Sequence, residues 1–558
     1  MTFIQEAFEL GNHFTSDRVL QSYLRRWLPS EVLEEIRPQL ERVGADAGGR
    51  LWDLSMSARN EEPELIHFDP WGRRIDEIRV PAAWKEYARV AAEEGLVATA
   101  YDGAHGGHSR IHQFALAYLL DRSTHTYSCP LAMTDGAART LLHHGHEGLI
   151  AEAVGHLTSR DPDAMWTAGQ WMTERTGGSD VGLSETVARK DGDSWRLHGT
   201  KWFTSATTSE MALTLARPEG NPAGGRGLAL FHVQVRDEEG ALNGITIHRL
   251  KEKLGTKMLP TAELTLDGAL ATPVAGLDNG IRNITPLLNI TRTWNAVCSV
   301  GSMRMGVALA RDFASRRVAF GAPLSEKALH QDTLGGMQAE FEGAFHLAFE
   351  VVRLLGREEH GEISDPERGT LRLLFPLAKL LTARQAVAGA SEALEAFGGA
   401  GYVEDTGLPR LLRDTQVLSI WEGTTNVLSL DSLRAIARDG ALEPFLAHLQ
   451  GCLEGVSHER LGGCTADALG AASAAAQWLK SAGAESQEAM EAGARRFALT
   501  LGRAMSLALL TAHAQWALDT EGDDLPMLAA ERYASAGVDL LHSAGHDGAA
   551  RRRLAMDQ

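Results

Sequence analysis

The hydrophobic period of the chain changes twice along its 558 residues. From Pro81, a residue suited to a first helical turn, to about residue 165 apolar side chains recur at helical spacing, as from Trp84 to Leu96. The pattern then alternates, as strands do, until about residue 280, where helical spacing returns. The runs that read as strands are 195–203, 228–235, 245–247 and 263–266. This order predicts an α+β fold whose strands form one small antiparallel barrel or sandwich between helical segments.

Five segments follow from these changes, because a single hydrophobic core stops growing at about 250 to 300 residues. Residues 1–80 are polar and irregular, and we expect them to form an extended N-terminal arm with turns. An N-terminal helical domain is expected over 81–163, the β domain over 164–279, and a C-terminal helical bundle over 280–440. A glycine-rich start and an alanine-rich helical pattern predict an extra helical domain over 441–558.

Composition narrows the classes of protein to consider. A formal charge of −19 makes nucleic acid an unfavourable partner. No apolar run approaches the ~20 residues of a membrane helix, and the N-terminus lacks the basic and apolar regions of a secretory signal. We therefore expect a cytoplasmic protein with no membrane association. The four cysteines are scattered and His143, His144 and His146 lack evident acidic partners, so we predict no disulfide framework and no metal site.

The segment 413–426 is too polar and too punctuated to continue the flanking helical patterns, and it predicts a short loop between two helices. Within it Glu422 lies between Trp421 and Gly423. A carboxylate shielded by an indole is partly desolvated, which favours proton uptake, as a general base requires. The segment alone equally allows a solvated loop carboxylate.

Two segments of the β domain carry groups that suit a flat polar ring system. In 170–180, Thr173, Gly178 and Ser179 offer hydroxyls and closely approachable backbone amides. In 201–205, the Trp202 indole could lie against such a ring while Thr204 bonds its edge. Aromatic strand residues more often belong to a core, so each segment alone leaves both interpretations open.

Together these segments resemble the acyl-CoA dehydrogenase family of flavoproteins. Met172-Thr173-Glu174 with Gly178-Ser179-Asp180 is similar to its first signature, and Lys201-Trp202-Phe203-Thr204 to its flavin-shielding strand. Arg317 to Gly321 is similar to its R-x-x-F-G motif, and 397–402 with 413–426 to its second signature. The arm at 63–79, the Trp-Glu-Gly-Thr-Thr-Asn loop and the extra C-terminal domain resemble the AidB-like branch, which is associated with the response to DNA alkylation.

The resemblance implies an FAD enzyme in which Glu422 removes the α-proton of an acyl-CoA thioester while the flavin N5 accepts the β-hydride. Ser179 and Arg292 would meet the substrate together with Glu422. It further implies a homotetramer, a role in fatty acid metabolism, and an electron-transfer flavoprotein or another electron acceptor. The cofactor-binding residues would be Met172, Thr173, Gly178, Ser179, Trp202, Thr204, Arg317, Phe320, Gln331, Glu395, Gly398, Gly399, Thr424 and Asn426, with Gly398 and Gly399 supplied by another subunit.

Two positions depart from the family pattern. Glu395 stands where relatives often have glutamine, and Asn289 where many have aspartate. The first affects a hydrogen bond on the adenosine side of FAD and the second a contact with CoA. Neither touches the predicted base.

Two other functions remain open. One is an AidB-like flavoprotein of the alkylation response, with low turnover and DNA association, and the other is a flavin oxidase on a non-CoA substrate. From residue 441 onward the chain has nine basic and fifteen acidic residues, a net charge of −6, with one basic run at 551–553. Because DNA binding needs clustered cations to displace counterions, we predict that this domain does not bind DNA appreciably.

Overall fold

The computed structural model describes residues 7–237, 239–541 and 548–558. The chain begins with three helices, α1 (Arg18–Trp27), α2 (Ser30–Gly48) and α3 (Arg50–Ser57), followed by a hairpin of β1 (Glu64–Phe68) and β2 (Arg74–Arg79). The predicted extended arm is therefore wrong for 18–57. Leu20, Tyr23 and Leu24 supply a buried apolar face to α1, and the Asp17 side chain accepts the Leu20 N–H as an N-cap. Polar residues separate these apolar positions in the sequence, so the amphipathic pattern of α1 is easily overlooked there.

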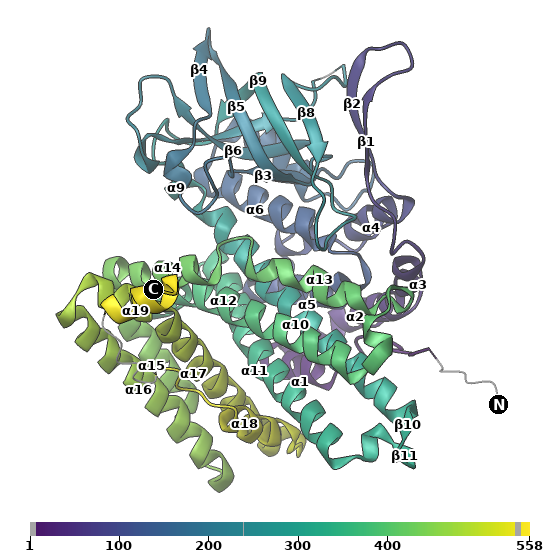
Figure 1. The fold of residues 1–558 in the computed structure, drawn as a ribbon, viewed down its shortest axis with the longest axis vertical. Helices are drawn as coiled ribbons and strands as arrows, with labels where there is room; N and C mark the ends of the chain where they lie inside the picture. The colour runs from purple at the N-terminus through teal and green to yellow at the C-terminus, as the bar shows by residue number, and fades with distance from the viewer. Residues whose placement is uncertain (1–6, 238, 542–547) are drawn as a thin grey trace.

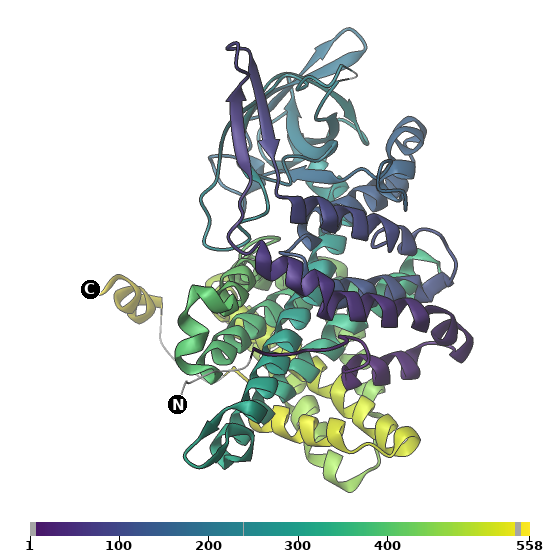
Figure 2. The same cartoon turned by 90° about the vertical axis from the view of Figure 1, so that its right-hand side faces the viewer.

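The hairpin docks on the β domain rather than on the helices. The Ile247 N–H donates to Asp76 Oδ2 at 3.0 Å, and Arg74 Nη2 donates to the Ile247 carbonyl at 2.9 Å. Figure 2 shows the first helices in purple lying across the helical part of the molecule, with the hairpin rising beside the barrel.

The N-terminal helical domain contains α4 (Ala82–Glu93), α5 (Ser109–Leu120) and α6 (Ser128–His144), with short helices α7 (Glu147–Leu149) and α8 (Gly155–Leu157). Every residue of α5 is buried, because α2, α10 and α11 surround it. This helix therefore forms part of the central core rather than of a peripheral domain (Figure 1).

Seven strands form the β domain, in the order β3-β6-β4-β5-β9-β7, with β8 paired to β9. A further pairing of β6 with β7 closes the sheet into a small barrel. The pairings β3–β6 and β4–β6 are parallel, which corrects the expectation of a purely antiparallel barrel. The strands are β3 (Ala168–Trp171), β4 (Val187–Asp191), β5 (Ser194–Ser205), β6 (Met211–Pro218), β7 (Ala229–Gln234), β8 (Ile245–Leu250) and β9 (Thr261–Pro273).

Three helices of equal length form the bundle below the barrel: α10 (Thr285–Arg316), α11 (Ala328–Glu359) and α12 (Asp365–Ala396). The short helix α9 (Gly280–Asn283) precedes them, and the strands β10 (Val318–Ala319) and β11 (Ala322–Pro323) join α10 to α11. After α12 come α13 (Leu408–Gln416) and α14 (Thr425–Asp439). The predicted sequence of helices, strands and helices is confirmed.

The extra domain is helical as predicted, with α15 (Leu442–Leu453), α16 (Gly462–Glu485), α17 (Gln487–Glu521), α18 (Leu525–Ser535) and α19 (Gly548–Met556). Among the described residues, α17 alone is long and apolar enough to cross a membrane. However, 89% of its most apolar window is buried within the protein, as expected for a core helix.

The first helix and the extra domain are joined by polar contacts. Arg25 Nε pairs with Glu521 Oε1 at 2.5 Å, and Arg18 Nη1 pairs with Asp523 Oδ2 at 3.3 Å. Between them Ser22 Oγ donates to Glu521 Oε2 at 2.7 Å. The helix α1 thus contacts the C-terminal end of α17.

Candidate functional site

Glu422 lies on a loop between α13 and α14, beneath the barrel. Its backbone φ is +56° and that of Gly423 is +103°, so two consecutive residues have left-handed conformations. The carboxylate is half-buried and accepts a hydrogen bond from Thr291 Oγ1, which lies 2.6 Å from Glu422 Oε2. Thr424 then caps α14 by accepting the Val427 N–H. A loop is present as predicted, but it is shorter than the predicted 413–426: α13 continues to Gln416, a single 3-10 turn covers 417–419, and α14 begins at Thr425.

Two cations lie close to this loop. Lys379 on α12 is buried, and its Nζ donates to the Gly423 carbonyl at 2.7 Å. Burial lowers the pKa of Lys379 to about 7, while Glu422 raises this pKa and Arg292 lowers it. Arg292 on α10 is paired with Asp431 Oδ2 at 2.8 Å. The predicted substrate residue Arg292 therefore lies in the same region as the predicted base.

The two flavin segments of the barrel meet through their backbones. The Trp202 N–H donates to the Thr173 carbonyl at 3.0 Å. A Cβ built on Gly178 would lie 2.6 Å from Thr173 Oγ1, so only glycine allows this turn to close over Thr173. Met172 is half-buried and Ser179 is exposed at the same turn. The structure therefore brings together the segments that the sequence places some 30 residues apart.

A buried ion pair supports these segments from inside the barrel. Lys201 Nζ lies 2.8 Å from Glu174 Oε1, and both side chains are almost fully excluded from solvent. The Thr186 hydroxyl also donates to Glu174 Oε1, at 2.6 Å. Because Glu174 follows Thr173 and Lys201 precedes Trp202, this pair fixes the spacing of the two segments.

The remaining β5 residues have their own partners. Lys251 Nζ lies 3.8 Å from the centroid of the Trp202 ring, and the Arg175 guanidinium lies 5.3 Å from it. Thr204 is buried and its hydroxyl donates to the Ala262 carbonyl at 2.9 Å. The Trp202 side chain is thus held in a cationic environment at the lower end of the barrel.

A second group of predicted cofactor residues lies at the opposite end of the bundle. The Phe313 and Phe397 rings pack in a tilted arrangement with centroids 4.4 Å apart, and this contact joins the end of α10 to the end of α12. It brings the Arg317–Phe320 segment near the turn that contains Gly398 and Gly399, while Gln331 Nε2 donates to the Ser325 carbonyl at 2.8 Å. Phe320 is 97% exposed, and Gln331, Glu395, Gly398 and Gly399 are exposed as well.

Besides the barrel segments, the predicted site residues thus form two separate groups on one chain. The first contains Glu422, Arg292, Thr424 and Asn426. The second is the exposed group around Phe320 and Gly398. Thr291 and Lys379 were not predicted, since they lie 131 and 44 residues along the chain from the loop residues that they contact. Only the fold brings them to the loop.

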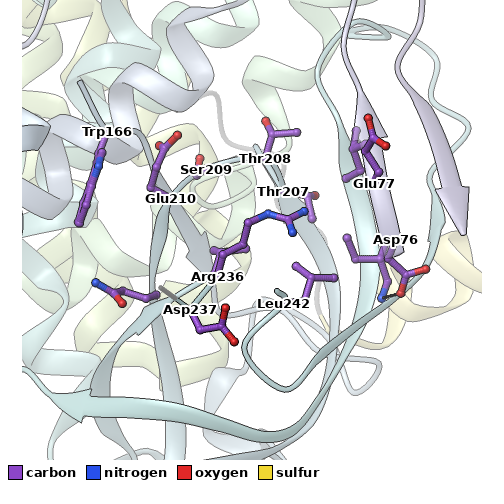
Figure 3. Close-up of a pocket in the computed structure, with 14 residues that line it drawn as sticks. Asp76, Glu77, Trp166, Thr207, Thr208, Ser209, Glu210, Arg236, Asp237 and Leu242 are labelled. Atoms are coloured by element: carbon purple, nitrogen blue, oxygen red, sulfur yellow. Dashed lines mark hydrogen bonds between the residues drawn. The ribbon is translucent and has the colours of Figure 1, made fainter. Parts of the chain in front are cut away.

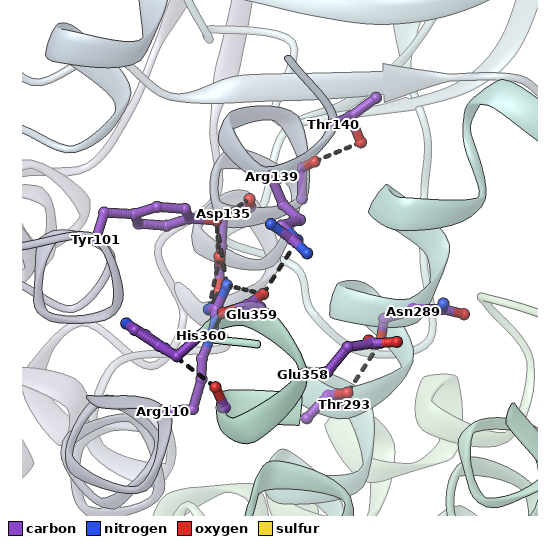
Figure 4. A network of polar contacts seen from close by, with 12 residues as sticks. Tyr101, Arg110, Asp135, Arg139, Thr140, Asn289, Thr293, Glu358, Glu359 and His360 are labelled. Carbon is purple, nitrogen blue, oxygen red and sulfur yellow. Dashed lines mark hydrogen bonds and ion pairs between the residues drawn. The ribbon is translucent and has the colours of Figure 1, made fainter. Parts of the chain in front are cut away.

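A buried polar network holds α10 in place (Figure 4). Asp135 accepts from Arg110 Nη1 at 2.8 Å, from the Tyr101 hydroxyl at 2.7 Å and from Trp294 Nε1 at 2.8 Å. Arg110 is fully buried and also pairs with Glu359 at 2.7 Å. Because Trp294 lies on the same helix as Thr291, the network fixes the helix that carries the hydrogen-bond partner of Glu422.

A cavity of about 480 Å³ lies beside the hairpin, at the end of β7 (Figure 3). Its lining includes Asp76, Glu77, Glu210 and Asp237, with the Arg236 guanidinium among them. Burial raises the pKa of Glu210. The lining contains none of the predicted site residues, and it contains neither the turn at Gly178 nor the turn at Gly398 and Gly399. The cavity is therefore separate from the candidate site.

The histidine run at the end of α6 has ordinary structural partners. His144 Nε2 bonds the Asn283 carbonyl at 2.7 Å, and His146 caps α7 by accepting the Leu149 N–H. Within the described part of the chain, no three His, Cys, Asp or Glu side chains are grouped in a way that could hold a metal ion.

Family models match four successive parts of the chain. The N-terminal domain of the adaptive response protein AidB matches residues 5–164, and the middle and C-terminal domains of acyl-CoA dehydrogenase match 169–269 and 278–437. A model described as acyl-CoA dehydrogenase 11 C-terminal domain-like matches 440–554. The matched regions span almost the whole chain in the family order.

Individual relatives agree with these matches. Acyl-CoA dehydrogenase family member 11 of Caenorhabditis elegans is 47% identical over 445 residues, covering 78% of this chain and 72% of that protein. The putative acyl-CoA dehydrogenase AidB of Escherichia coli is 31% identical over 453 residues, covering 78% and 80%. The crystal structure of C. elegans ACDH-11 in complex with C11-CoA has a TM-score of 0.93 at 41% identity, and covers 100% of this chain and 96% of that one. The resemblance drawn from the sequence is confirmed, and the chain belongs to the acyl-CoA dehydrogenase family of FAD-dependent oxidoreductases.

Proposed function

We propose that this protein dehydrogenates an acyl-CoA thioester, with Glu422 as the base. The observation that carries the proposal is the Glu422 carboxylate, held by Thr291 at 2.6 Å on a loop of left-handed backbone. A base must be positioned before the substrate arrives, because proton transfer depends on a distance within hydrogen-bond reach. The complex of ACDH-11 with C11-CoA supports an acyl-CoA thioester as the substrate class.

The residues around the barrel segments fit FAD. Gly178 leaves its backbone uncovered where a side chain would collide with Thr173, which suits close approach of a ring or a phosphate. The Trp421 Nε1 and Gln170 Oε1 atoms are buried without a hydrogen-bond partner, so polar groups of a ligand could satisfy both. One subunit would hold FAD through Met172, Thr173, Gly178, Ser179, Trp202, Thr204, Thr424 and Asn426.

The exposed second group suits the adenosine half of a cofactor held mainly by another subunit. Phe320 has a backbone φ of +51°, and its side chain extends into solvent beside the turn of Gly398 and Gly399. Another subunit packed against this turn, as the family resemblance implies, would cover the Phe320 ring. Arg317, Phe320, Gln331, Glu395, Gly398 and Gly399 would complete the site, and a homotetramer of paired dimers is the assembly that we propose.

Bound FAD supplies the acceptor for the hydride that leaves the substrate β-carbon. The chain supplies the base and the support for developing charge. Glu422 takes the α-proton on its carboxylate, while its own backbone N–H donates to the thioester carbonyl, where the enolate charge develops. Thr291 holds the other end of the carboxylate, so that one oxygen remains free for the proton. An electron-transfer flavoprotein or another acceptor would then reoxidise the enzyme.

Replacing Glu422 by glutamine tests the base. The amide is nearly isosteric, so we expect Glu422→Gln to retain the fold and its FAD and to lose at least ~100-fold in the rate of flavin reduction, the lower end for a positioned base. The measurement is anaerobic bleaching of the flavin by a panel of saturated acyl-CoAs in a stopped-flow instrument.

The same panel separates the alternatives. Wild-type rates in Glu422→Gln would place the base elsewhere, and Glu395 would be the next carboxylate to replace. Bleaching by a nitroalkane but by no acyl-CoA, with oxygen uptake, would instead indicate an oxidase on a non-CoA substrate.

A further inference from the structure

The buried ammonium of Lys379 lies against the catalytic loop and has no role in the function proposed above. Lys379 is only 1% exposed and lies on α12, 44 residues before Gly423, whose carbonyl it contacts at 2.7 Å. Over the described residues this is its only hydrogen bond, although an ammonium has three donors. Burying a charge with so few partners is costly, so the site has to compensate for it electrostatically.

The surrounding charges identify Glu422 as the counter-ion. The nearby Arg292 on α10 is already paired with Asp431 of α14 at 2.8 Å. Asp431 also accepts from Arg372 on α12 at 3.2 Å, so its charge is shared by two guanidinium groups. Glu422 therefore remains as the carboxylate for Lys379. Cys129 on α6 also faces Glu422, and burial raises the pKa of this thiol to about 12, so it is neutral near pH 7.

The hydrogen bond also restrains the backbone. Glu422 has φ of +56°, a conformation that a residue with a side chain adopts only under strain. Gly423 has φ of +103°, and a Cβ at this position would lie 2.8 Å from Leu428 Cδ2. A carbonyl held at one end of this strained turn fixes the direction of the Glu422 side chain and of its N–H.

We propose that Lys379 is a positioning residue for the base: it holds the Gly423 carbonyl, and with it the strained turn that carries Glu422, and it places a buried ammonium near that loop. The inference rests on the proposed function, because it assigns Lys379 to the same reaction. Thr291 fixes the carboxylate from α10, and Lys379 fixes the loop from α12.

This arrangement has a definite pH dependence. Since burial lowers the pKa of Lys379 to about 7, its charge is present on the acid side of neutrality and is lost above it. The loop of the base therefore has a positive charge beside it only on the acid side of neutrality, and a nearby positive charge disfavours protonation of a carboxylate.

Three variants separate the charge from the hydrogen bond. Lys379→Met removes both, Lys379→Gln keeps a neutral donor, and Lys379→Arg keeps charge and donor. Lys379→Met and Lys379→Gln both lack the positive charge. For these two variants we expect the acid limb of the pH profile of single-turnover flavin reduction to move up by about 1 pH unit. Their rates at pH 5 to 6 should fall about tenfold, and the difference from wild type should vanish above about pH 8. Lys379→Arg should restore the acid limb of the wild-type profile.

Lys253→Met is the matched control. Lys253 is a half-buried lysine that donates to the Thr256 and Leu259 carbonyls, and over the described residues it makes no hydrogen bond to the loop of Glu422. We expect it to leave the acid limb unmoved. The FAD content and melting temperature of every variant are measured alongside.

The outcomes distinguish this inference from the proposed function. If Glu422→Gln is inactive and Lys379→Met has the wild-type acid limb, the inference is wrong and the base assignment stands. A uniform loss of rate with an unmoved limb would indicate a purely structural lysine and would overturn it as well. If Glu422→Gln reduces its flavin normally, the proposed base itself is wrong. If Lys379→Met does not fold, the comparison of Lys379→Gln with Lys379→Arg decides the same question.

Discussion

Glu174 and Lys201 show how a buried ion pair can position a site without touching the reacting atoms. Burial raises the pKa of Glu174, but Lys201 and hydrogen bonds from Thr186 and the Glu185 N–H outweigh it, so the net effect is a lowered pKa. Replacing such a pair by apolar residues can be nearly neutral for stability, whereas removing one partner leaves an uncompensated charge. We therefore expect the Glu174–Lys201 pair to fix the spacing of Thr173 and Trp202 rather than to stabilise the barrel.

Removing Lys201 alone should loosen the barrel strongly. We expect Lys201→Met to cost about 3 to 5 kcal/mol of local stability, because the Glu174 carboxylate remains buried. Hydrogen exchange in β3 and β5 would then accelerate at least ~100-fold, since each tenfold corresponds to about 1.4 kcal/mol. The double variant Lys201→Met with Glu174→Leu should exchange more slowly than the single variant. Equal exchange in the two would contradict this account.

At the scale of elements, most of the fold follows from sequence periodicity, and the exceptions have physical causes. Strand β6 was not predicted because residues 211–216 are all buried, so its sequence shows no alternation. The four residues of β3 are too few to show a period. The loop around Glu422 was predicted because Gly423 and the polar residues after it interrupt helical spacing.

The site was predictable to a lesser extent. Motif resemblance identified the segments, but the partners Thr291 and Lys379 lie inside the long helices α10 and α12. In such helices, where core residues surround them, a threonine or lysine carries no local signal of function. Their roles depend on which helix face meets the loop, and tertiary packing decides this.

The contact of α15 with α11 should depend on pH. Burial disfavours the charged form of His448, yet hydrogen bonds to Cys452 and Glu350 outweigh it and raise the pKa of His448 to about 10. Because this folded-state pKa exceeds the unfolded value of 6.5, the stabilisation is complete below about pH 6.5 and is lost as the pH rises toward 10. We expect opening of α15, measured by hydrogen exchange corrected for intrinsic rates, to increase at least ~10-fold between pH 7 and 10.

His448→Gln is the control for this effect. Glutamine can still donate to Glu350 but does not titrate, so the correction for intrinsic exchange should leave a flat profile. The same rise with pH in the variant would assign the effect to another group.

At the scale of the whole molecule, charge argues against a DNA-bound role, although the AidB relative is 31% identical. The extra domain has a net charge of −6. Several of its basic residues are also neutralised within the protein, since Arg460 pairs with Glu531 at 2.6 Å and Arg503 with Glu340 at 2.9 Å. Few cations remain to displace counterions from phosphates.

We therefore expect double-stranded DNA to bind no tighter than ~100 μM at physiological salt, the weak limit of non-specific binding. Fluorescence anisotropy with a labelled duplex would measure this. Sub-micromolar affinity that survives deletion of residues 551–558 would contradict the prediction and would favour the DNA-protective function over the dehydrogenase.

The contacts between α1 and the end of α17 also bear on biosynthesis. Arg18 and its partner Asp523 are separated by 505 residues, so a ribosome that adds about 5 to 20 residues per second makes the second roughly 25 to 100 s after the first. During that interval Arg25 and Ser22 lack their partner Glu521, and the surface of α1 that meets α17 stays uncovered. The docking of α1 on α17 is thus a late step in folding during synthesis, and a chain truncated before α17 would leave the α17-facing surface of α1 uncovered.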